Sequence, residues 1–275
     1  MLGVRVHSGA QKSYYLALFS QITTEITSSR IASDNPIHQR LLFAYEAAKN
    51  YVSGNVLEVG CGEGRGLEVL SSLCSVYTAL DKNKALLDDL SQKYPNFTFL
   101  ETNVPPFSGI GSNVFDCVIA FQVIEHIPND DLFVKEIHRV LKPGGIAIIT
   151  TPNILLTLTR NPWHEREYTA LQLNMLLSKY FSSVSAQGIT GSQRVWDYYE
   201  LNKKSVQKYT KWDIFNLQHR LPSAWLRLPY DILNRRNRNK MMMSDNSLVA
   251  EITTDDFKLS PEPEKCFDLF YVAKK

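Results

Sequence analysis

Short apolar runs alternate with amphipathic helical patterns through the middle of the chain, from Asn55 to Asn153. The apolar runs are VLEVG, VYTALD, FTFL, FDCVIAF and IAIITTPN, and the spacing of apolar residues in GLEVLSSL, ALLDDLSQKY and DLFVKEIHRVL is helical. Such alternation predicts βαβ units and a parallel sheet covered by helices on both faces. The nearly continuous apolar runs agree, because parallel strands are buried on both faces. The pattern therefore predicts an α/β fold.

The segments on either side of this core carry other patterns. Before it, residues 11–50 are predicted to be helical from two apolar series, Leu16, Phe19, Ile22 and Ile26, then Leu41, Leu42, Tyr45 and Ala48. After it, TALQLNMLLSKYF predicts a helix that Thr169 can cap, and VSAQGIT predicts a sixth strand. Residues 193–250 break the alternation with tryptophans, tyrosines, prolines and a basic run. This stretch indicates a helical insertion before the closing strand CFDLFYVAKK.

We therefore expect a single domain over residues 1–275. It consists of an N-terminal helical lid at 1–50, a core at 51–192, a helical insertion or second lid at 193–250, and a closing strand region at 251–275. A chain of 275 residues is also long enough for two small domains. One enlarged domain is favoured, since the excess length is concentrated in the N-terminal helices and the insertion.

Composition and charge exclude several classes of protein. Hydrophobic residues make up 44% of the chain and charged residues 21%, which is typical of a folded globular protein. The 30 Lys and Arg against 28 Asp and Glu leave a net charge of +2, so we expect no nucleic-acid partner. The four cysteines form no Cys-x-x-Cys pair, and no apolar run reaches the roughly 20 residues that span a bilayer. With no signal-peptide pattern at the start, we expect a cytoplasmic protein without a transmembrane segment.

The candidate chemistry begins where the first predicted strand ends, in LEVGCGEGRG at 57–66. A strand that runs into closely spaced glycines and then a helix lets the backbone approach a ligand without interference from Cβ atoms. The dinucleotide-binding pattern G-x-G-x-x-G is not met, since its third glycine would fall on Arg65 or Leu67. That mismatch disfavours a nicotinamide-dependent oxidoreductase. Taken alone, the stretch can also be interpreted as a tight turn that binds nothing.

The glycines follow G-x-G-x-G instead, with Glu58 two residues before the first of them. This pattern resembles the first motif of the class I S-adenosylmethionine (SAM)-dependent methyltransferases. Further segments occur in that family's order across residues 55–153: LDK at 80–82, FTFLETNVPPF, FDCVIAFQVIEHI at 115–127 and LKPGG at 141–145. The resemblance implies a Rossmann-like fold with a mostly parallel seven-stranded sheet, whose antiparallel last strand runs from Cys266 to Ala273.

The resemblance also implies a SAM site along the carboxyl ends of the strands. Asp81 is expected at the ribose, because a carboxylate accepts hydrogen bonds from both ribose hydroxyls. Asn103 stands where the family usually has an aspartate, next to the adenine, so an amide there accepts from the adenine amino group without supplying a charge. In full, the cofactor-binding residues that the resemblance implies are Glu58, Gly60, Cys61, Gly62, Gly64, Asp81, Lys82, Asn103, Val104, Phe121 and Gln122.

Two histidines are candidates for catalysis. The methyl group of a sulfonium is already activated, so its transfer to a hydroxyl needs an oxygen held in line and a base that removes the proton. His126 follows the fourth strand, in a segment that the family places beside the methyl donor, although fixing a loop explains it equally well. His164 lies in NPWHEREYT at 161–169, which resembles the branch of the family that modifies small molecules and glycans. We favour His164 as a residue that faces the substrate.

Charged residues elsewhere carry less information. We expect no metal site, because neither Asp130 with Asp131 nor Glu165 with Glu167 gathers the oxygen ligands of a calcium loop. A basic run at 234–240 follows an apolar series, Trp225, Leu226, Leu228, Tyr230, Ile232 and Leu233. One interpretation of this stretch is peripheral contact with a membrane, or with a phosphorylated or lipid-linked substrate. The other is an ordinary solvated loop.

Together these patterns predict a SAM-dependent methyltransferase for a small-molecule, sugar or lipid-linked acceptor, with oxygen as the nucleophile. Methylation of an adenine or glutamine amino group is disfavoured, because no Asn-Pro-Pro-Tyr type motif follows the fourth strand. Two alternatives stay open: a SAM-binding or scaffolding module without catalysis, and a methyltransferase for protein or RNA. The N-terminal helices and the insertion are expected to cover the pocket, exclude water and select the acceptor. The oligomeric state is left open.

Overall fold

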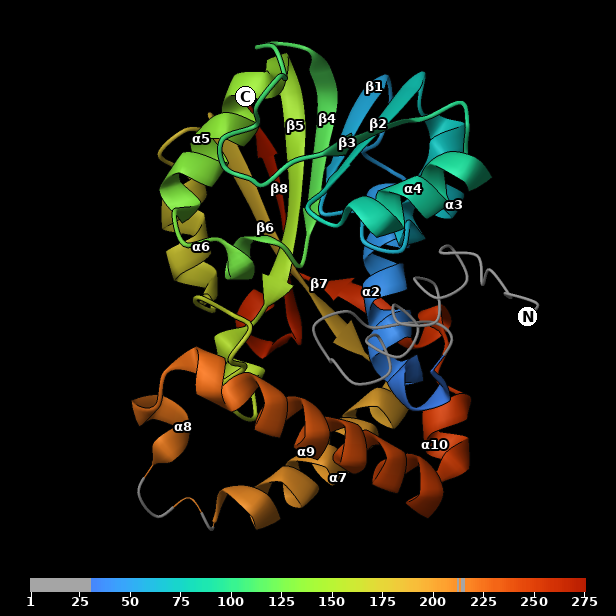
Figure 1. The fold of residues 1–275 in the computed structure, drawn as a ribbon, viewed down its shortest axis with the longest axis vertical. Coiled ribbons are helices and arrows are strands. Elements are labelled where there is room, and N and C mark those ends of the chain that lie inside the picture. The colour runs from blue at the N-terminus through green and yellow to red at the C-terminus, as the bar shows by residue number, and fades with distance from the viewer. Residues whose placement is uncertain (1–30, 212, 214–215) are drawn as a thin grey trace, which may run out of the picture.

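A computed structural model describes residues 31–275 except 212, 214 and 215. The helix expected from Leu16 to Ile26 therefore lies outside the described residues. Within the described part, eight strands form one sheet in the order β3-β2-β1-β4-β5-β8-β6-β7 (Figure 1). The strands are β1 (Asn55–Val59), β2 (Val76–Asp81), β3 (Thr98–Glu101), β4 (Phe115–Phe121), β5 (Leu141–Pro152), β6 (Ser183–Gly191), β7 (Phe257–Ser260) and β8 (Asp268–Lys274).

The sheet is parallel over its first five positions and antiparallel beyond them. β1 lies between β2 and β4, and β3 to β5 run in one direction through parallel pairs. The closing strand β8 is antiparallel to β5, as predicted, and it inserts between β5 and β6. The prediction of seven strands is wrong, because β7 adds an eighth, antiparallel to β6. Its residues FKLS fall in the closing strand region at 251–275, where a single strand was expected.

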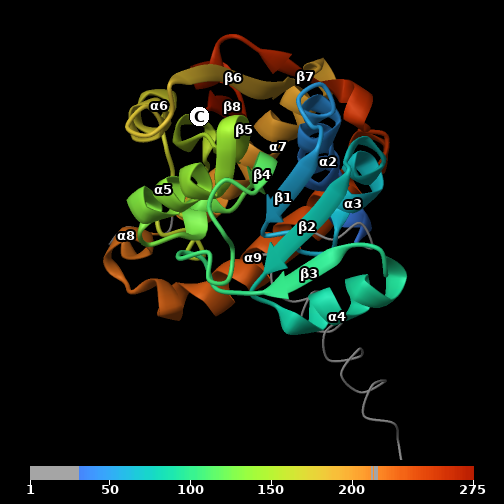
Figure 2. The same cartoon turned by 90° about the horizontal axis from the view of Figure 1, so that it is seen from above.

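Helices cover both faces of the sheet, which confirms the α/β class. Figure 2 shows α5 and α6 on one side of the sheet and α2, α3 and α4 on the other. A separate apolar core fills each side. The helices on the two faces are α2 (Asn35–Ala48), α3 (Arg65–Leu70), α4 (Lys84–Lys93), α5 (Asp130–Val140) and α6 (Ala170–Leu177). As predicted, Thr169 caps α6, since its side chain accepts from Gln172 N while the Gln172 side chain accepts from Thr169 N.

Four further helices lie beyond the carboxyl ends of the parallel strands (Figure 1). They are α7 (Gln193–Thr210), α8 (Leu217–Arg220), α9 (Ser223–Ser244) and α10 (Asn246–Ala250). α9 packs on α7 and α10, and α10 also contacts α2. Short 3-10 helices connect the larger elements, among them η1 (Ala32–Asp34) before α2 and η3 (Ile124–His126) after β4. The carboxyl edge of the sheet is therefore covered by elements from both ends of the described chain.

Candidate active site

The glycine loop after β1, residues 60–64, presents backbone at the carboxyl edge of the sheet. Gly60, Gly62 and Gly64 all have positive φ, between 52° and 81°, which favours glycine. An added Cβ would come within 2.5 Å of Val123 at Gly60 and of Leu90 at Gly64, but it would meet nothing within 4 Å at Gly62. The backbone at Gly62 therefore faces space that a ligand can enter, while the other two glycines allow close packing.

Asp81 joins this loop to the end of β2. Its Oδ2 accepts a hydrogen bond from Gly62 N at 2.9 Å, and its Oδ1 accepts one from Asn83 N at 2.8 Å. Each carboxylate oxygen can accept a further bond, so Asp81 can also receive two hydroxyl donors. Lys82 beside it is exposed, whereas Cys61 is buried and burial raises the pKa of its thiol. The part of this group that a ligand can reach is thus the Gly62 backbone with Asp81 and Lys82.

Glu58 lies behind the loop and is 1% exposed. Tyr45 of α2 and Tyr77 of β2 each donate a hydroxyl hydrogen bond to its carboxylate, both at 2.7 Å. Burial raises the pKa of Glu58 to about 7, although the two hydroxyl donors oppose the rise. This placement makes Glu58 a support for the loop from behind rather than a residue on its open side. Sequence reasoning missed the roles of both tyrosines, because an aromatic residue that only fills a core has the same pattern.

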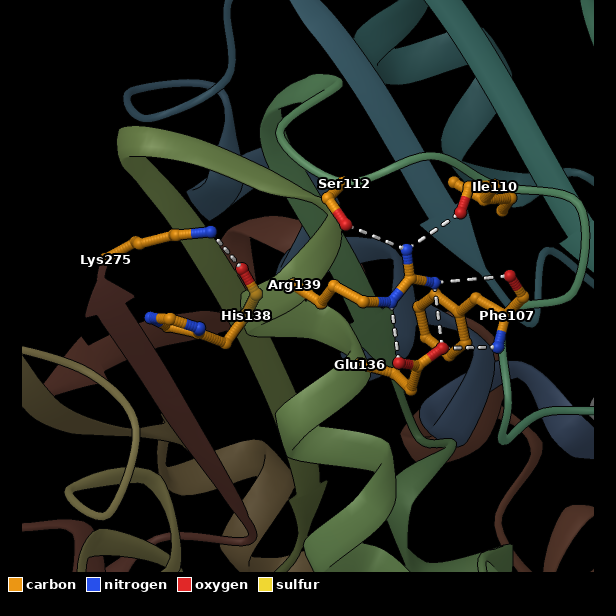
Figure 3. Close-up of polar contacts among 7 residues, drawn as sticks. All are labelled: Phe107, Ile110, Ser112, Glu136, His138, Arg139 and Lys275. Atoms are coloured by element: carbon orange, nitrogen blue, oxygen red, sulfur yellow. Dashed lines mark hydrogen bonds and ion pairs between the residues drawn. The ribbon is translucent and has the colours of Figure 1, made fainter.

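The loop after β3 carries Asn103, which is exposed, and Val104, which is half-buried. Farther along, the loop is fastened to α5 by charged contacts (Figure 3). Arg139 Nε donates to Glu136 Oε1 at 2.7 Å, and Glu136 Oε2 accepts from the backbone N of Phe107 at 2.9 Å. These contacts restrict the conformations of the loop that contains Asn103 and Val104.

Phe121 and Gln122 end β4 next to the glycine loop. Phe121 is buried, and its ring meets that of Tyr45 edge-on at 4.8 Å between centroids. Gln122 has a φ of 56°, in the left-handed region that side chains other than glycine rarely adopt. Its backbone N donates to Thr150 O at 2.9 Å and its Nε2 to Thr150 Oγ1 at 3.3 Å. These bonds to β5 hold Gln122 in that conformation.

A cavity of about 270 Å³ lies next to Gln122, between the ends of β4 and β5 and the helices α2, α7 and α9. Its volume is close to the lower end of the range for small-molecule sites. The lining mixes apolar side chains with hydrogen-bonding ones from distant parts of the chain, among them Gln122, Asn153, His164, Tyr198, Tyr230 and Arg238. Gln122 belongs both to the strand end beside the glycine loop and to this cavity, so the two regions adjoin there.

A buried ion cluster ties α9 to the start of the described chain. Asp34 in η1 has no exposed surface, and its Oδ1 accepts from Arg235 Nη1 at 2.7 Å and from Arg238 Nη1 at 2.8 Å. Arg236 and Lys240, in contrast, are exposed. The interpretation of the basic run as a solvated loop is wrong, because the run is helical and half of its cations pair with Asp34.

Apolar side chains on α9 remain exposed. Trp225 is 72% exposed and Leu228 61%, and Ile232 and Leu233 are also exposed. Their spacing places Trp225, Leu228 and Ile232 along one stripe of the helix. Within the described residues, every helix is too short or too polar to cross a membrane.

The fold brings His126 and His164 into contact. Their rings meet edge-on, with centroids 4.9 Å apart. Nδ1 of His126 lies 2.9 Å from the carbonyl oxygen of Trp163, and Nδ1 of His164 lies 2.7 Å from Glu167 Oε1. His164 lines the cavity, and its Nε2 lies 2.8 Å from the side-chain nitrogen of Asn161. Of the two candidate catalytic histidines, His164 therefore lines the cavity and His126 packs against its ring.

Glu125 is the acidic neighbour of these rings. It is 1% exposed, and its Oε2 accepts a hydrogen bond from Thr151 Oγ1 at 3.0 Å. Burial raises its pKa to about 7, and the charge of His164 opposes the rise. Sequence reasoning missed Glu125 as a neighbour of His164, because α5 and β5 lie between the two segments in the chain. It also missed Glu167 as the partner of His164, although Glu167 follows it by only three residues. The cluster can accept and hold a proton at the cavity wall.

Comparison with known proteins identifies relatives for both the sequence and the fold. Residues 57–149 match the protein family described as a methyltransferase domain. A probable S-adenosylmethionine-dependent methyltransferase of Mycolicibacterium smegmatis is 28% identical over 254 residues, which cover 90% of each chain. A mitochondrial ubiquinone biosynthesis O-methyltransferase of Dictyostelium discoideum is 33% identical over 135 residues, or 44% of this chain and 39% of that one.

The fold is similar to solved structures along nearly its whole length. A SAM-dependent methyltransferase from Thermotoga maritima, described as a possible histamine N-methyltransferase, aligns with a TM-score of 0.55 and covers 96% of this chain and 95% of that chain. The two sequences are 12% identical, so this likeness concerns the fold alone.

Proposed function

Because this chain is a class I SAM-dependent methyltransferase, we propose that it transfers a methyl group to an oxygen of a small-molecule, sugar or lipid-linked acceptor. The observation that carries this proposal is the cavity beside Gln122, which adjoins the glycine-loop region and contains His164. A donor and an acceptor bound in these two regions would meet at the end of β4. Such an arrangement holds the reacting groups close and in line.

The residues at the carboxyl edge fit the methyl donor. The open side of Gly62 allows a ligand to approach the backbone, and Asp81 has acceptor capacity for a ribose diol. Asn103 and Val104 would border the adenine, and Phe121 and Gln122 the sulfonium. Gly60, Gly64 and Cys61 would shape the loop, with Glu58 behind it and Lys82 at its edge. SAM, when bound, supplies a methyl group that its positively charged sulfur has already activated.

His164 would remove the proton of the acceptor hydroxyl. Its Nδ1 donates to Glu167, which orients the ring and stabilises the imidazolium that forms. Its Nε2 then accepts the proton, and an acceptor hydroxyl there would replace the contact with Asn161. His126 packs edge-on against the ring and restricts its orientation. Loss of the proton leaves an oxygen nucleophile for the methyl group.

The helices beyond the sheet would select the acceptor. α2, α7 and α9 supply much of the cavity wall. Residues 193–250 and the helical segment before residue 50 would therefore act as lids over the core at 51–192. Residues 251–275 would contribute the closing strand region of the same domain. The relative named as an O-methyltransferase supports oxygen as the methylated atom. The near-balanced net charge of +2 supports an acceptor other than nucleic acid. The four cysteines are unpaired, which supports a cytoplasmic location.

The exposed apolar stripe on α9 supports a lipid-linked acceptor. Trp225 and Leu228 would enter the interface of a membrane, while the exposed cation Arg236 lies on the same helix and would meet anionic headgroups. Peripheral binding of this kind would bring the cavity close to an acceptor held in the bilayer.

The membrane contact is tested by sedimentation with anionic phospholipid vesicles. We expect wild-type chain to sediment, the double variant Trp225→Ser/Leu228→Ser to stay in solution, and the control Leu171→Ser on α6, exposed to 66%, to behave as wild type.

The decisive experiment for the reaction is an acceptor screen with methyl-labelled SAM. Hydroxylated small molecules, glycans and lipid-linked sugars are offered in solution and in vesicles, and the labelled atom is located by mass spectrometry and NMR. We expect label on an acceptor oxygen. Binding of SAM without transfer to any acceptor would favour the scaffolding module, and label on protein or RNA would favour the other alternative. Binding of NADH but not of SAM would contradict the assignment.

A further inference from the structure

Glu125, His126 and His164 form a cluster with the composition of a metal site. One ligand-type atom from each residue, a carboxylate oxygen and two ring nitrogens, lies within 4.8 Å of the others. Ligands of a tetrahedral ion at about 2.1 Å lie roughly 3.4 Å apart, so binding would need each pair to close by at most about 1.4 Å. We expect rotations of the side chains to supply this movement. We therefore propose that these three residues bind a divalent transition-metal ion.

The contacts around the cluster are those that orient metal ligands. A histidine that binds a metal usually directs its other ring nitrogen to a carboxylate or a backbone carbonyl. Here Nδ1 of His164 is bonded to Glu167 Oε1, and Nδ1 of His126 to the carbonyl oxygen of Trp163. Thr151 donates to Glu125, which fixes the carboxylate. Both kinds of supporting partner are therefore present.

The backbone also holds the two halves of the cluster together. Glu125 and His126 lie in η3 after β4, and His164 lies in the segment after β5. The backbone N of Glu165 donates to the carbonyl oxygen of Glu125 at 2.7 Å, and that of Arg166 at 3.3 Å to the same oxygen. The spacing of the ligands thus depends on backbone bonds rather than on flexible side chains alone. With the backbone held this way, only the side chains need to move when an ion enters or leaves.

The donor set determines which ions fit. Two imidazoles and one carboxylate suit Zn²⁺, Co²⁺, Ni²⁺ or Fe²⁺ rather than Mg²⁺ or Ca²⁺, which prefer oxygen ligands throughout. Three protein ligands leave at least one position for another oxygen, and His164 places that position at the cavity wall. A hydroxyl next to such an ion has a lowered pKa. This role rests on the oxygen acceptor proposed above, and in it His164 would be a metal ligand rather than the base. Binding of the ion itself does not depend on the proposed function.

The sequence did not predict this site, because strand pairing brings its two histidines together. The charged pairs Asp130 with Asp131 and Glu165 with Glu167 are visible as neighbours in the sequence, but neither pair contributes a ligand here. His126 and His164 come together only because β4 and β5 are adjacent in the sheet. The metal set thus depends on strand order, which spacing along the chain does not show.

Binding of Co²⁺ to the chelator-treated full chain tests the proposal. Calorimetry gives stoichiometry and affinity, and the visible absorption of Co²⁺ reports nitrogen and oxygen coordination. We expect one ion per chain, with affinity reduced at least about tenfold in Glu125→Gln, His126→Ala and His164→Ala. We also expect a reduction in Glu167→Gln, which leaves all three ligands in place, and wild-type affinity in the control His219→Ala, whose side chain is exposed on α8. Thermal unfolding of each variant shows which ones keep the fold.

Two results would overturn the metal site. One is Co²⁺ affinity of the folded double variant His126→Ala/His164→Ala equal to that of the wild type. The other is an absence of visible Co²⁺ bands in the wild-type chain. If no ion binds and the chelator-treated chain still methylates its acceptor, the metal proposal fails and the proposed function stands. If the ion binds but no acceptor is methylated, the proposed function fails and the metal site stands.

Discussion

The glycine-loop region and the cavity proposed for the acceptor adjoin at Gln122, but they are built in different ways. The loop region consists of the ends of neighbouring parallel strands, each followed directly by its functional residues. The cavity is lined by α2, the segment after β5, α7 and α9, which are far apart in the chain. Backbone conformation determines the first region, because positive φ at three glycines shapes it. Side chains and ion pairs between distant elements determine the second.

Because the two regions are built differently, we expect different substitutions to affect the binding of SAM and of the acceptor. A substitution that alters the backbone at the loop should weaken binding of SAM and leave the acceptor side intact. A substitution in the ion pairs of α9 should do the reverse. A substitution at the histidine cluster, where both substrates would meet, should affect the rate rather than either affinity.

His164→Ala should give the largest effect. Without the ring, the proposed base for the acceptor hydroxyl is lost, or, with an ion bound, a ligand is lost. We expect turnover to fall by at least about 100-fold, with the Kd for SAM nearly unchanged. Steady-state kinetics and calorimetry with SAM measure the two quantities. Wild-type turnover in this variant would exclude His164 from the reaction.

Gly62→Ala should weaken binding of SAM by about tenfold, since its Cβ would project into the space proposed for the ligand. The variant should also lose stability, because an L-residue in the left-handed region costs roughly 1–2 kcal/mol. Gly144→Ala is a matched control. Gly144 also has positive φ, 79°, and nothing within 4 Å of an added Cβ, but it lies in the turn at the start of β5. Both variants should lose similar stability, and only Gly62→Ala should lose affinity. Equal affinity for SAM in the two variants would place the ligand elsewhere.

Asp34→Asn should affect the acceptor side. Removing the charge leaves Arg235 and Arg238 without their shared carboxylate, so α9 and its cavity residues are held less firmly. We expect the KM for the acceptor to rise several-fold while the Kd for SAM stays the same. Asp131→Asn is the control, because it breaks an exposed ion pair with Lys179 on the surface. An unchanged KM in Asp34→Asn would mean that α9 does not shape the acceptor site.

Glu58→Gln should give the smallest effect, a pH-dependent change in stability. Burial raises the pKa of Glu58 from 4.5 to about 7 in the folded chain. Between these values the unfolded chain has lost the proton that the folded chain keeps, so ionisation increasingly favours unfolding as pH rises, until both states are ionised above 7. Glutamine has no such proton. The Tm of the variant should therefore rise relative to wild type by a few degrees from pH 4.5 to 7 and then level off. A difference in Tm that is constant with pH would contradict this assignment.

The contrast between the two regions also explains how far the sequence could be interpreted. The alternation of strands and helices, the glycine loop and the Thr169 cap depend on local patterns, and all three are visible along the chain. The Asp34 cluster is not visible, because its arginines lie at the other end of the described chain. The same holds for the contact between His126 and His164, which requires β4 and β5 to be adjacent. Spacing identifies residues that share a strand or helix, whereas tertiary packing decides which of them meet.

The most direct test of this account is a double-mutant cycle between the two regions. The Kd for SAM and the KM for the acceptor are measured in Gly62→Ala, in Asp34→Asn and in the double variant. Since the residues belong to separately built regions, the effects should add: the double variant should have the Kd of Gly62→Ala and the KM of Asp34→Asn, with a coupling below about 0.5 kcal/mol. If each single substitution changes both quantities, or if the coupling exceeds that value, the two regions do not bind two different substrates.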